Sequence, residues 1–176
     1  MSPNFRPRRP ALALLVLATA LPAVARAQLP TPAPPTERER VAQAERILLD
    51  PMVDNKVVLR TVQYLATVKG GHKALIRAAD RFARDRNDDN LATTLRFLAE
   101  SVRDRPDLIP DRLIPLYVRL LETRKDPDPA VIALMGSLGP RARAALPSLR
   151  SLRDGQDPAR SLEATRAIAR IERNKE

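Results

Sequence analysis

The stretch that decides the fold runs from Leu138 to Ile171 and reads LGPRARAALPSLRSLRDGQDPARSLEATRAIARI. Pro140 suits the first position of one helix, and Pro158 opens a second helix behind Asp157, a good cap. Apolar residues then recur every three or four positions, the spacing of one helical face, in two groups. These are Ala142, Ala145, Leu146, Leu149 and Leu152, then Ala164, Ala167, Ile168 and Ile171. The stretch therefore predicts two helices joined by a short polar turn.

A hairpin of this kind cannot bury both apolar stripes alone and needs similar neighbours. The same spacing predicts six more helices after Thr36, and no stretch alternates as a strand would. Their stripes are Val41, Ala44 and Leu48; Val58, Val62 and Leu65; Leu75, Ala78, Ala79 and Phe82; Leu91, Leu95, Leu98 and Val102; Leu113, Tyr117, Leu120 and Leu121; and Val131, Leu134, Met135 and Leu138. We therefore expect an all-α fold, an α-α superhelix of about four helical hairpins. A plain helical bundle is the alternative.

The same C-terminal stretch resembles the short bacterial HEAT-like repeat first associated with phycobilin lyase subunits. The matching positions are Gly139-Pro140, Ala145 to Leu149, Asp157-Pro158 and Ala167-Ile168. Arg160 and Ala169 depart from the pattern, where the family usually has an apolar residue and a glycine. The resemblance implies a HEAT/armadillo-like solenoid, whose first helix is kinked; Pro147 inside that helix predicts such a kink. Because these repeats serve unrelated functions, the resemblance bears on fold more than on function.

The N-terminal region reads as an export signal followed by a linker. Residues 1–27 combine an arginine-containing start, an apolar run and the small-residue pattern Ala25-Arg26-Ala27, which predicts a Sec-type signal peptide cleaved after Ala27. A retained membrane anchor is the alternative, although the run is shorter than the roughly 20 residues of a span. Residues 28–35 form a Pro-rich linker, and residues 36–176 form the HEAT-like repeat domain. The expected location is the periplasm or the extracellular space.

Charge points to one candidate surface. The whole chain carries a net charge of +10, and removing residues 1–27, with four Arg and no acid, leaves +6. Arginine is enriched towards the C-terminus, up to Arg173, and could form a face for a partner or an anion. A merely solvated surface is the alternative. The residues of this predicted arginine face are Arg141, Arg143, Arg150, Arg153, Arg160, Arg166 and Arg170.

The residue types needed for catalysis or metal binding do not come together in the sequence. There is no Cys, and His72 is the only histidine. Asp85, Asn87 and Asp89 have the spacing of calcium ligands, but Arg96 stands where a bidentate Glu is required. We read this segment as a polar turn that caps a helix. The sequence therefore predicts no catalytic residue, no metal site and no cofactor.

These observations favour a non-catalytic protein-binding or scaffold module of the cell envelope. The resemblance alone suggests an alternative, a lyase-like or hydrolytic enzyme helper, and the arginine face suggests another, a polyanion binder. We expect a protein partner, no nucleic acid and no stable membrane insertion after signal cleavage. Apolar residues in the last predicted helix, Leu162, Ile168 and Ile171, would allow self-association at the C-terminal end if some of them are exposed.

Overall fold

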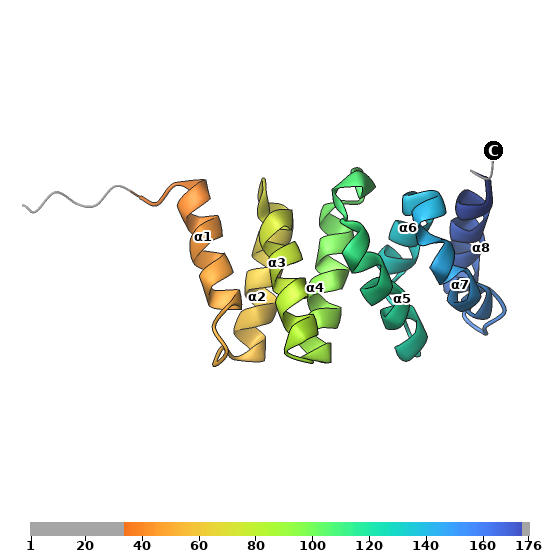
Figure 1. The fold of residues 1–176 in the computed structure, drawn as a ribbon, viewed down its shortest axis with the longest axis horizontal. Helices are drawn as coiled ribbons and strands as arrows, with labels where there is room; N and C mark the ends of the chain where they lie inside the picture. The colour runs from red at the N-terminus through yellow and green to blue at the C-terminus, as the bar shows by residue number, and fades with distance from the viewer. Residues whose placement is uncertain (1–33, 174–176) are drawn as a thin grey trace, which may run out of the picture. The chain divides into compact units, whose positions relative to one another are not determined.

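The computed structural model describes residues 34–173, so the predicted signal peptide and most of the predicted linker lie outside the described residues. The described chain is built from α-helices and three 3₁₀ segments, and it contains no strand (Figure 1). The α-helices are α1 Glu37–Leu48, α2 Asn55–Thr67, α3 Gly71–Arg84, α4 Asp88–Ser101, α5 Ile114–Thr123, α6 Pro129–Leu138, α7 Leu146–Arg153 and α8 Pro158–Arg173. The 3₁₀ segments are η1 Pro106–Leu108, η2 Asp111–Leu113 and η3 Gly139–Ala145. The predicted all-α class is confirmed.

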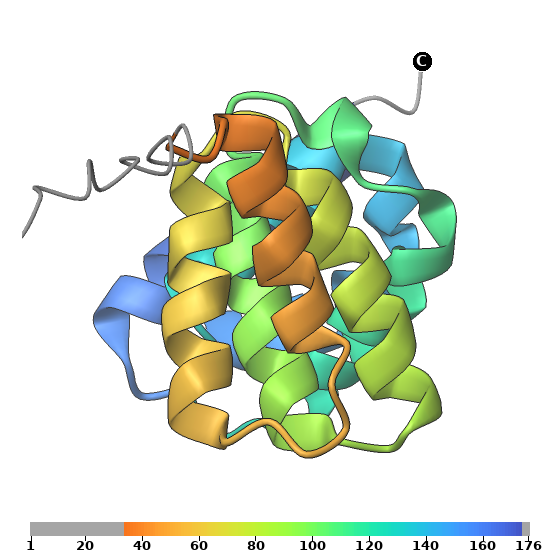
Figure 2. The same cartoon turned by 90° about the vertical axis from the view of Figure 1, so that its left-hand side faces the viewer.

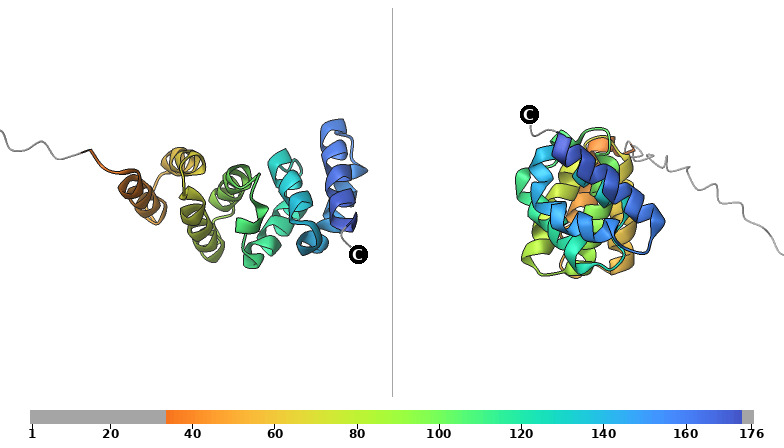
Figure 3. Two further views of the ribbon diagram at one scale, coloured as in Figure 1. Left: turned by 90° about the horizontal axis from the view of Figure 1, so that it is seen from above. Right: turned by 90° about the vertical axis from the view of Figure 1, so that its right-hand side faces the viewer.

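Consecutive helices pair into four hairpins that stack in chain order. The odd-numbered helices form one row and the even-numbered helices form a second row, as the left view of Figure 3 shows from above. In the second row α2 packs on α4, α4 on α6, and α6 on α8. Figure 2 looks along the stack from α1, with the later hairpins behind it. This layered arrangement is the α-α superhelix of four hairpins that the apolar spacing predicts.

Side-chain caps begin most of these helices. Thr36 and Glu39 form a capping box at α1, and Asp54, Asn87 and Asp128 accept backbone N–H groups at α2, α4 and α6. At α8 the predicted cap Asp157 accepts hydrogen bonds from the N–H groups of residues 159 and 160, at 2.9 and 3.2 Å. Caps of this kind satisfy the orphan donors of a first turn.

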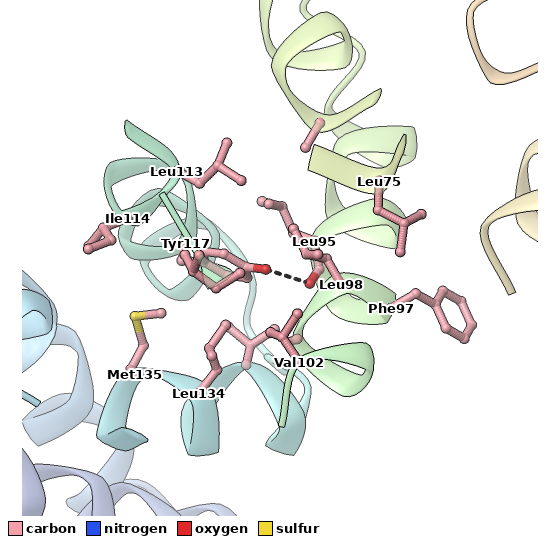
Figure 4. Close-up of a cluster of buried hydrophobic side chains, with 14 of the residues drawn as sticks. Leu75, Leu95, Phe97, Leu98, Val102, Leu113, Ile114, Tyr117, Leu134 and Met135 are labelled. Atoms are coloured by element: carbon pink, nitrogen blue, oxygen red, sulfur yellow. Dashed lines mark hydrogen bonds between the residues drawn. The ribbon is translucent and has the colours of Figure 1, made fainter. Parts of the chain in front are cut away.

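The predicted apolar stripes form one continuous core. All of their residues are buried except Val41, Leu120, Leu146 and Leu152, which are half-buried. Tyr117 is completely buried between the second and third hairpins. Its hydroxyl donates a hydrogen bond of 3.0 Å to the carbonyl oxygen of Leu95 on α4 (Figure 4). The only polar atom of this large side chain is therefore satisfied inside the core.

The α6–α8 contact is especially close. A Cβ added to Gly136 would lie 2.7 Å from the Cα and 3.0 Å from the Cβ of Ala167. Real Cβ atoms do not approach a neighbour's backbone so closely, so only glycine fits at this position. Small residues on both helices thus allow the last two even-numbered helices to pack nearly backbone to backbone.

The chain around Pro147 differs in detail from the expected kinked helix. Residues 139–145 form the 3₁₀ segment η3, in which Ala142 leaves helical geometry (φ −94°, ψ 18°). The α-helix proper begins at Leu146, so Pro147 occupies its first turn. There its missing N–H removes no helical hydrogen bond. The bend is therefore a break between two helical segments rather than a kink inside one.

We expect Gly136→Ala to lower the free energy of unfolding by up to about 2 kcal/mol. Overpacking against Ala167 costs about 1–3 kcal/mol and outweighs a gain in helix propensity of about 1 kcal/mol. Urea denaturation measures the change. Ser137→Ala, at the exposed neighbouring position, is the control and should change stability by less than about 0.5 kcal/mol. A Gly136→Ala protein more stable than wild type would contradict the close contact.

The two tyrosines provide a second, matched test of the core. Tyr117→Phe removes a buried hydrogen bond and should cost about 1 kcal/mol of unfolding free energy. The Tyr64 hydroxyl is also buried but has no hydrogen-bond partner among the described residues. Tyr64→Phe should therefore leave thermal stability unchanged or raise it. Thermal melting measures the stability of both variants. An equal loss of stability in the two would contradict the assignment of a hydrogen bond to Tyr117 and none to Tyr64.

Candidate functional site

The predicted arginine face is distributed over three elements of the last hairpin. Arg141 and Arg143 lie on η3, Arg150 and Arg153 lie on α7, and the remaining members, Arg160, Arg166 and Arg170, lie on α8. All of them are exposed except Arg160, which is half-buried. The structure therefore brings the predicted residues into one hairpin, but on different sides of it.

Five of these seven arginines are already paired with carboxylates. The pairs are Arg141 with Asp111 at 2.6 Å, Arg150 with Glu172 at 2.9 Å, Arg153 with Asp154 at 2.8 Å, Arg160 with Asp126 at 2.6 Å and Arg166 with Glu163 at 2.6 Å. Asp157 is a second partner of Arg160, at 3.1 Å. These internal pairs reduce the charge that the face presents to a ligand.

The remaining positive charge concentrates near the end of α8. Arg143 and Arg170 have no ion-pair partner within residues 34–173, and the same holds for Arg173 at the end of the enriched stretch. Arg170 and Arg173 line a shallow hollow of about 370 Å³ with Gly136, Ser137 and Gly139. This hollow is the part of the predicted arginine face best placed to receive an anion.

Ion pairs between neighbouring hairpins are a feature that the sequence analysis missed. In these pairs an arginine contacts a carboxylate that lies 30 to 35 residues away in the sequence, about the length of one helical hairpin. The pairs are Arg77 with Glu45, Arg112 with Asp80, Arg119 with Asp88, Arg124 with Asp89, Arg96 with Asp128, Arg141 with Asp111, and Arg160 with Asp126. The sequence does contain a signal for these pairs, because oppositely charged residues recur 30 to 35 positions apart.

A second hollow, of about 360 Å³, lies where α4, the α5–α6 connection and the start of α8 meet. Three arginines and three aspartates line it: Arg96, Arg124, Arg160, Asp89, Asp126 and Asp128. Each of these guanidinium groups already contacts one of these carboxylates, at 2.6 to 2.9 Å. Its charges are therefore balanced, and it offers an anion less than the α8 end does.

A third hollow, of about 310 Å³, opens between α1 and α2 at the start of the stack. Ala44, Ile47 and Tyr64 supply apolar lining, and Arg40 and Arg60 also border it. The buried hydroxyl of Tyr64 has no hydrogen-bond partner in the described chain. No sequence signal marks this hollow, because apolar residues recur at the same helical spacing whether or not another hairpin covers them.

The predicted calcium-like segment is a helix cap. Asn87 accepts a hydrogen bond of 3.2 Å from the backbone N–H of Asn90 and so begins α4. Asp85 pairs with Arg81 at 3.0 Å, and Asp89 pairs with Arg124 at 2.9 Å. Among residues 34–173 no three His, Asp or Glu side chains are grouped to hold a metal ion.

The surroundings of His72 and Tyr117 shift the pKa of each group. The pKa of His72, at the start of α3, is lowered by burial and by the nearby charges of Lys73 and Arg105. Burial raises the pKa of Tyr117 far above its usual range. Tyr117 therefore stays protonated in the folded protein, and its position inside the core keeps it from any hollow described above.

No protein family model, curated protein or solved structure matches the chain. Across the described residues, no helix combines the length and apolar character needed to span a bilayer. The protein is defined by its fold, an all-α stack of helical hairpins.

The free energy of unfolding should depend on pH through His72. Because the folded-state pKa lies below the ordinary value of 6.5, the unfolded chain takes up a proton first as the pH falls. The stability that the neutral imidazole contributes is complete above pH 6.5 and is lost as the pH falls through the folded-state pKa. Urea denaturation between pH 8 and 5.5 should show this loss.

His72→Gln should remove that part of the pH dependence. Lys73→Gln keeps the imidazole but removes one cationic neighbour, so the pKa of His72 in the folded protein should rise. The pH dependence should therefore remain, and the loss of stability should end at a higher pH than in wild type. An unchanged pH profile in His72→Gln would contradict the assignment.

Proposed function

We propose that this chain is a non-catalytic protein-binding or scaffold module of the cell envelope, built from HEAT-like repeats. The observation that carries the proposal is where its large exposed apolar residues lie. Within residues 34–173 they are Met52, Val57, Leu59 and Leu162, from 41% to 88% exposed. The first three belong to the first hairpin and the fourth lies on the last helix, so the large exposed apolar side chains of the described chain fall in its two terminal hairpins.

Terminal repeats of solenoids normally carry polar outer faces because nothing covers them. We take the exposed apolar residues of the two terminal hairpins as the contact points for another protein. The hollow between α1 and α2 adds a concave surface with apolar lining from Ala44, Ile47 and Tyr64. The charged side chains between the hairpins are engaged in ion pairs, which supports a structural role for them.

The cell-envelope part of the proposal depends on the sequence of the N-terminal region. The predicted signal peptide, residues 1–27, directs export, and the Pro-rich linker, residues 28–35, separates it from the helices. The HEAT-like assignment depends on the repeat pattern of residues 138–171 together with the stacked hairpins. The lyase-like or hydrolytic alternative has only the resemblance in its favour.

Site-specific photo-crosslinking of the exported full chain tests the proposal. We expect a benzoylphenylalanine residue at position 59 or 162 to give a discrete, saturable adduct with an envelope protein. The same residue in place of Arg84, exposed in the middle of the stack, is the control and should give less adduct. The absence of an adduct from both end positions would reject the protein-binding module.

A matched pair of variants makes the same prediction quantitative. Val57→Asp with Leu59→Asp replaces two exposed apolar side chains of α2 by charges and should reduce capture by the adduct-forming partner at least about tenfold. Gln63→Asp with Thr67→Asp adds the same charge to the same helix at exposed polar positions and should change capture by less than about threefold. Equal losses would show that net charge, rather than apolar contact, controls capture.

A further inference from the structure

We infer that the outward side of α8 is the docking site for an acidic segment of the partner protein. We call this surface the α8 end face, and its residues are Leu162, Arg166, Ala169, Arg170 and Arg173. The inference depends on the proposed function, since it assigns the partner's chemistry and its place on the stack.

The α8 end face follows from helical spacing. Leu162, Arg166, Ala169 and Arg173 succeed one another at intervals of four, three and four residues, which places them on one side of the helix. The buried side is formed by Ala164, Ala167, Ile168 and Ile171. The right view of Figure 3 looks at this end of the stack, with α8 in front. In the described chain no further hairpin covers the outward side.

The charge of the last hairpin favours an anionic partner. Residues 139–173 contain eight Arg and four Asp or Glu. Arg166 has a partner in Glu163, whereas Arg170 and Arg173 contact no carboxylate within the described residues. Guanidinium groups bind carboxylates through two parallel hydrogen bonds, and the hollow beside Arg170 and Arg173 leaves room for them.

A second copy of this chain fits the surface poorly. At the other end of the stack, Arg40 and Arg60 border the hollow between α1 and α2. The first hairpin is nevertheless balanced in charge, with five acidic and five basic residues between positions 37 and 67. Two α8 end faces, by contrast, would bring arginine against arginine. Like charges across an interface disfavour such pairings. We therefore assign the α8 end face to a different, acidic molecule; self-association of the mature chain that is lost in Arg170→Glu with Arg173→Glu would overturn this assignment.

Leu162 favours a protein segment over a nucleic acid or a lipid surface. Leu162 is 52% exposed and lies one helical turn before Arg166. An acidic helix can place an apolar side chain against Leu162 while carboxylates one turn apart meet the arginines. A phosphate backbone offers no apolar group at that spacing. Membrane insertion needs a broader apolar face than one leucine.

The direct test is binding of a labelled, helical 20-residue peptide that carries four Glu, spaced four, three and four residues apart, around one Leu. Arg170→Glu with Arg173→Glu in the full mature chain should weaken binding at least about tenfold. Arg38→Glu with Arg46→Glu makes the same charge change at the exposed side of α1 and should weaken binding less than about threefold. Circular dichroism and thermal melting establish that both variants fold.

Two results would overturn the inference from this assay. One is an equal loss of peptide binding in the two double variants, since net charge alone would then explain it. The other is tighter binding of a DNA duplex or of vesicles with anionic lipid than of the peptide, which would assign the surface to a different macromolecule. Replacement of the peptide's Glu by Gln should abolish binding; retention of binding would also reject an acidic partner.

Photo-crosslinking separates this inference from the proposed function. If the adduct formed at position 162 disappears in Arg170→Glu with Arg173→Glu but persists in Arg38→Glu with Arg46→Glu, the α8 end face is supported. If position 162 keeps its adduct in both variants, the inference fails and the protein-binding module stands. If wild type gives no adduct from position 59 or 162, the module itself fails.

Discussion

The packing of each even-numbered helix on the next is the constraint on which this structure depends. A single hairpin leaves one apolar stripe uncovered, and the neighbouring hairpin covers it. The row from α2 to α8 is therefore continuous, and its closest contact joins Gly136 on α6 to Ala167 on α8. Within residues 34–173 each hairpin packs mainly on its neighbours, so the first and the last hairpin each have one side that no other described hairpin covers.

The arginine ion pairs between hairpins contribute to the alignment of neighbouring hairpins more than to the stability of the stack. Exposed pairs contribute at most about 1 kcal/mol each, whereas the core is formed by side chains that are almost all inaccessible to water. Their value is geometric, because Arg112 can reach Asp80 only if the second and third hairpins are correctly aligned. The same pairs also decide which arginines remain available to a partner.

Much of the fold could be predicted from the sequence because helical burial is a local, periodic property. The stripe from Val58 to Leu65 and the cap at Asp157 are each visible within one segment, and both are confirmed. Partners separated by a whole repeat are different. Nothing near Arg160 in the sequence indicates Asp126 as its partner, and nothing near Tyr64 indicates that its hydroxyl lacks one. The candidate site depends on such distant pairings. The hairpin that carries the arginines could therefore be predicted from the sequence, but which of those arginines lack an ion-pair partner could not.

The two uncovered sides connect the architecture with the proposed function. A stack could end on polar residues at no cost to its core, yet Leu162 lies on the outward side of α8, and Tyr64 borders an apolar hollow at the first hairpin. The last hairpin also carries Arg170 and Arg173, which border a hollow and have no ion-pair partner within the described residues. Unpaired arginines disfavour the pairing of two such end faces and attract acidic surfaces. These features of the two terminal hairpins are the basis of our proposal that the stack binds another protein.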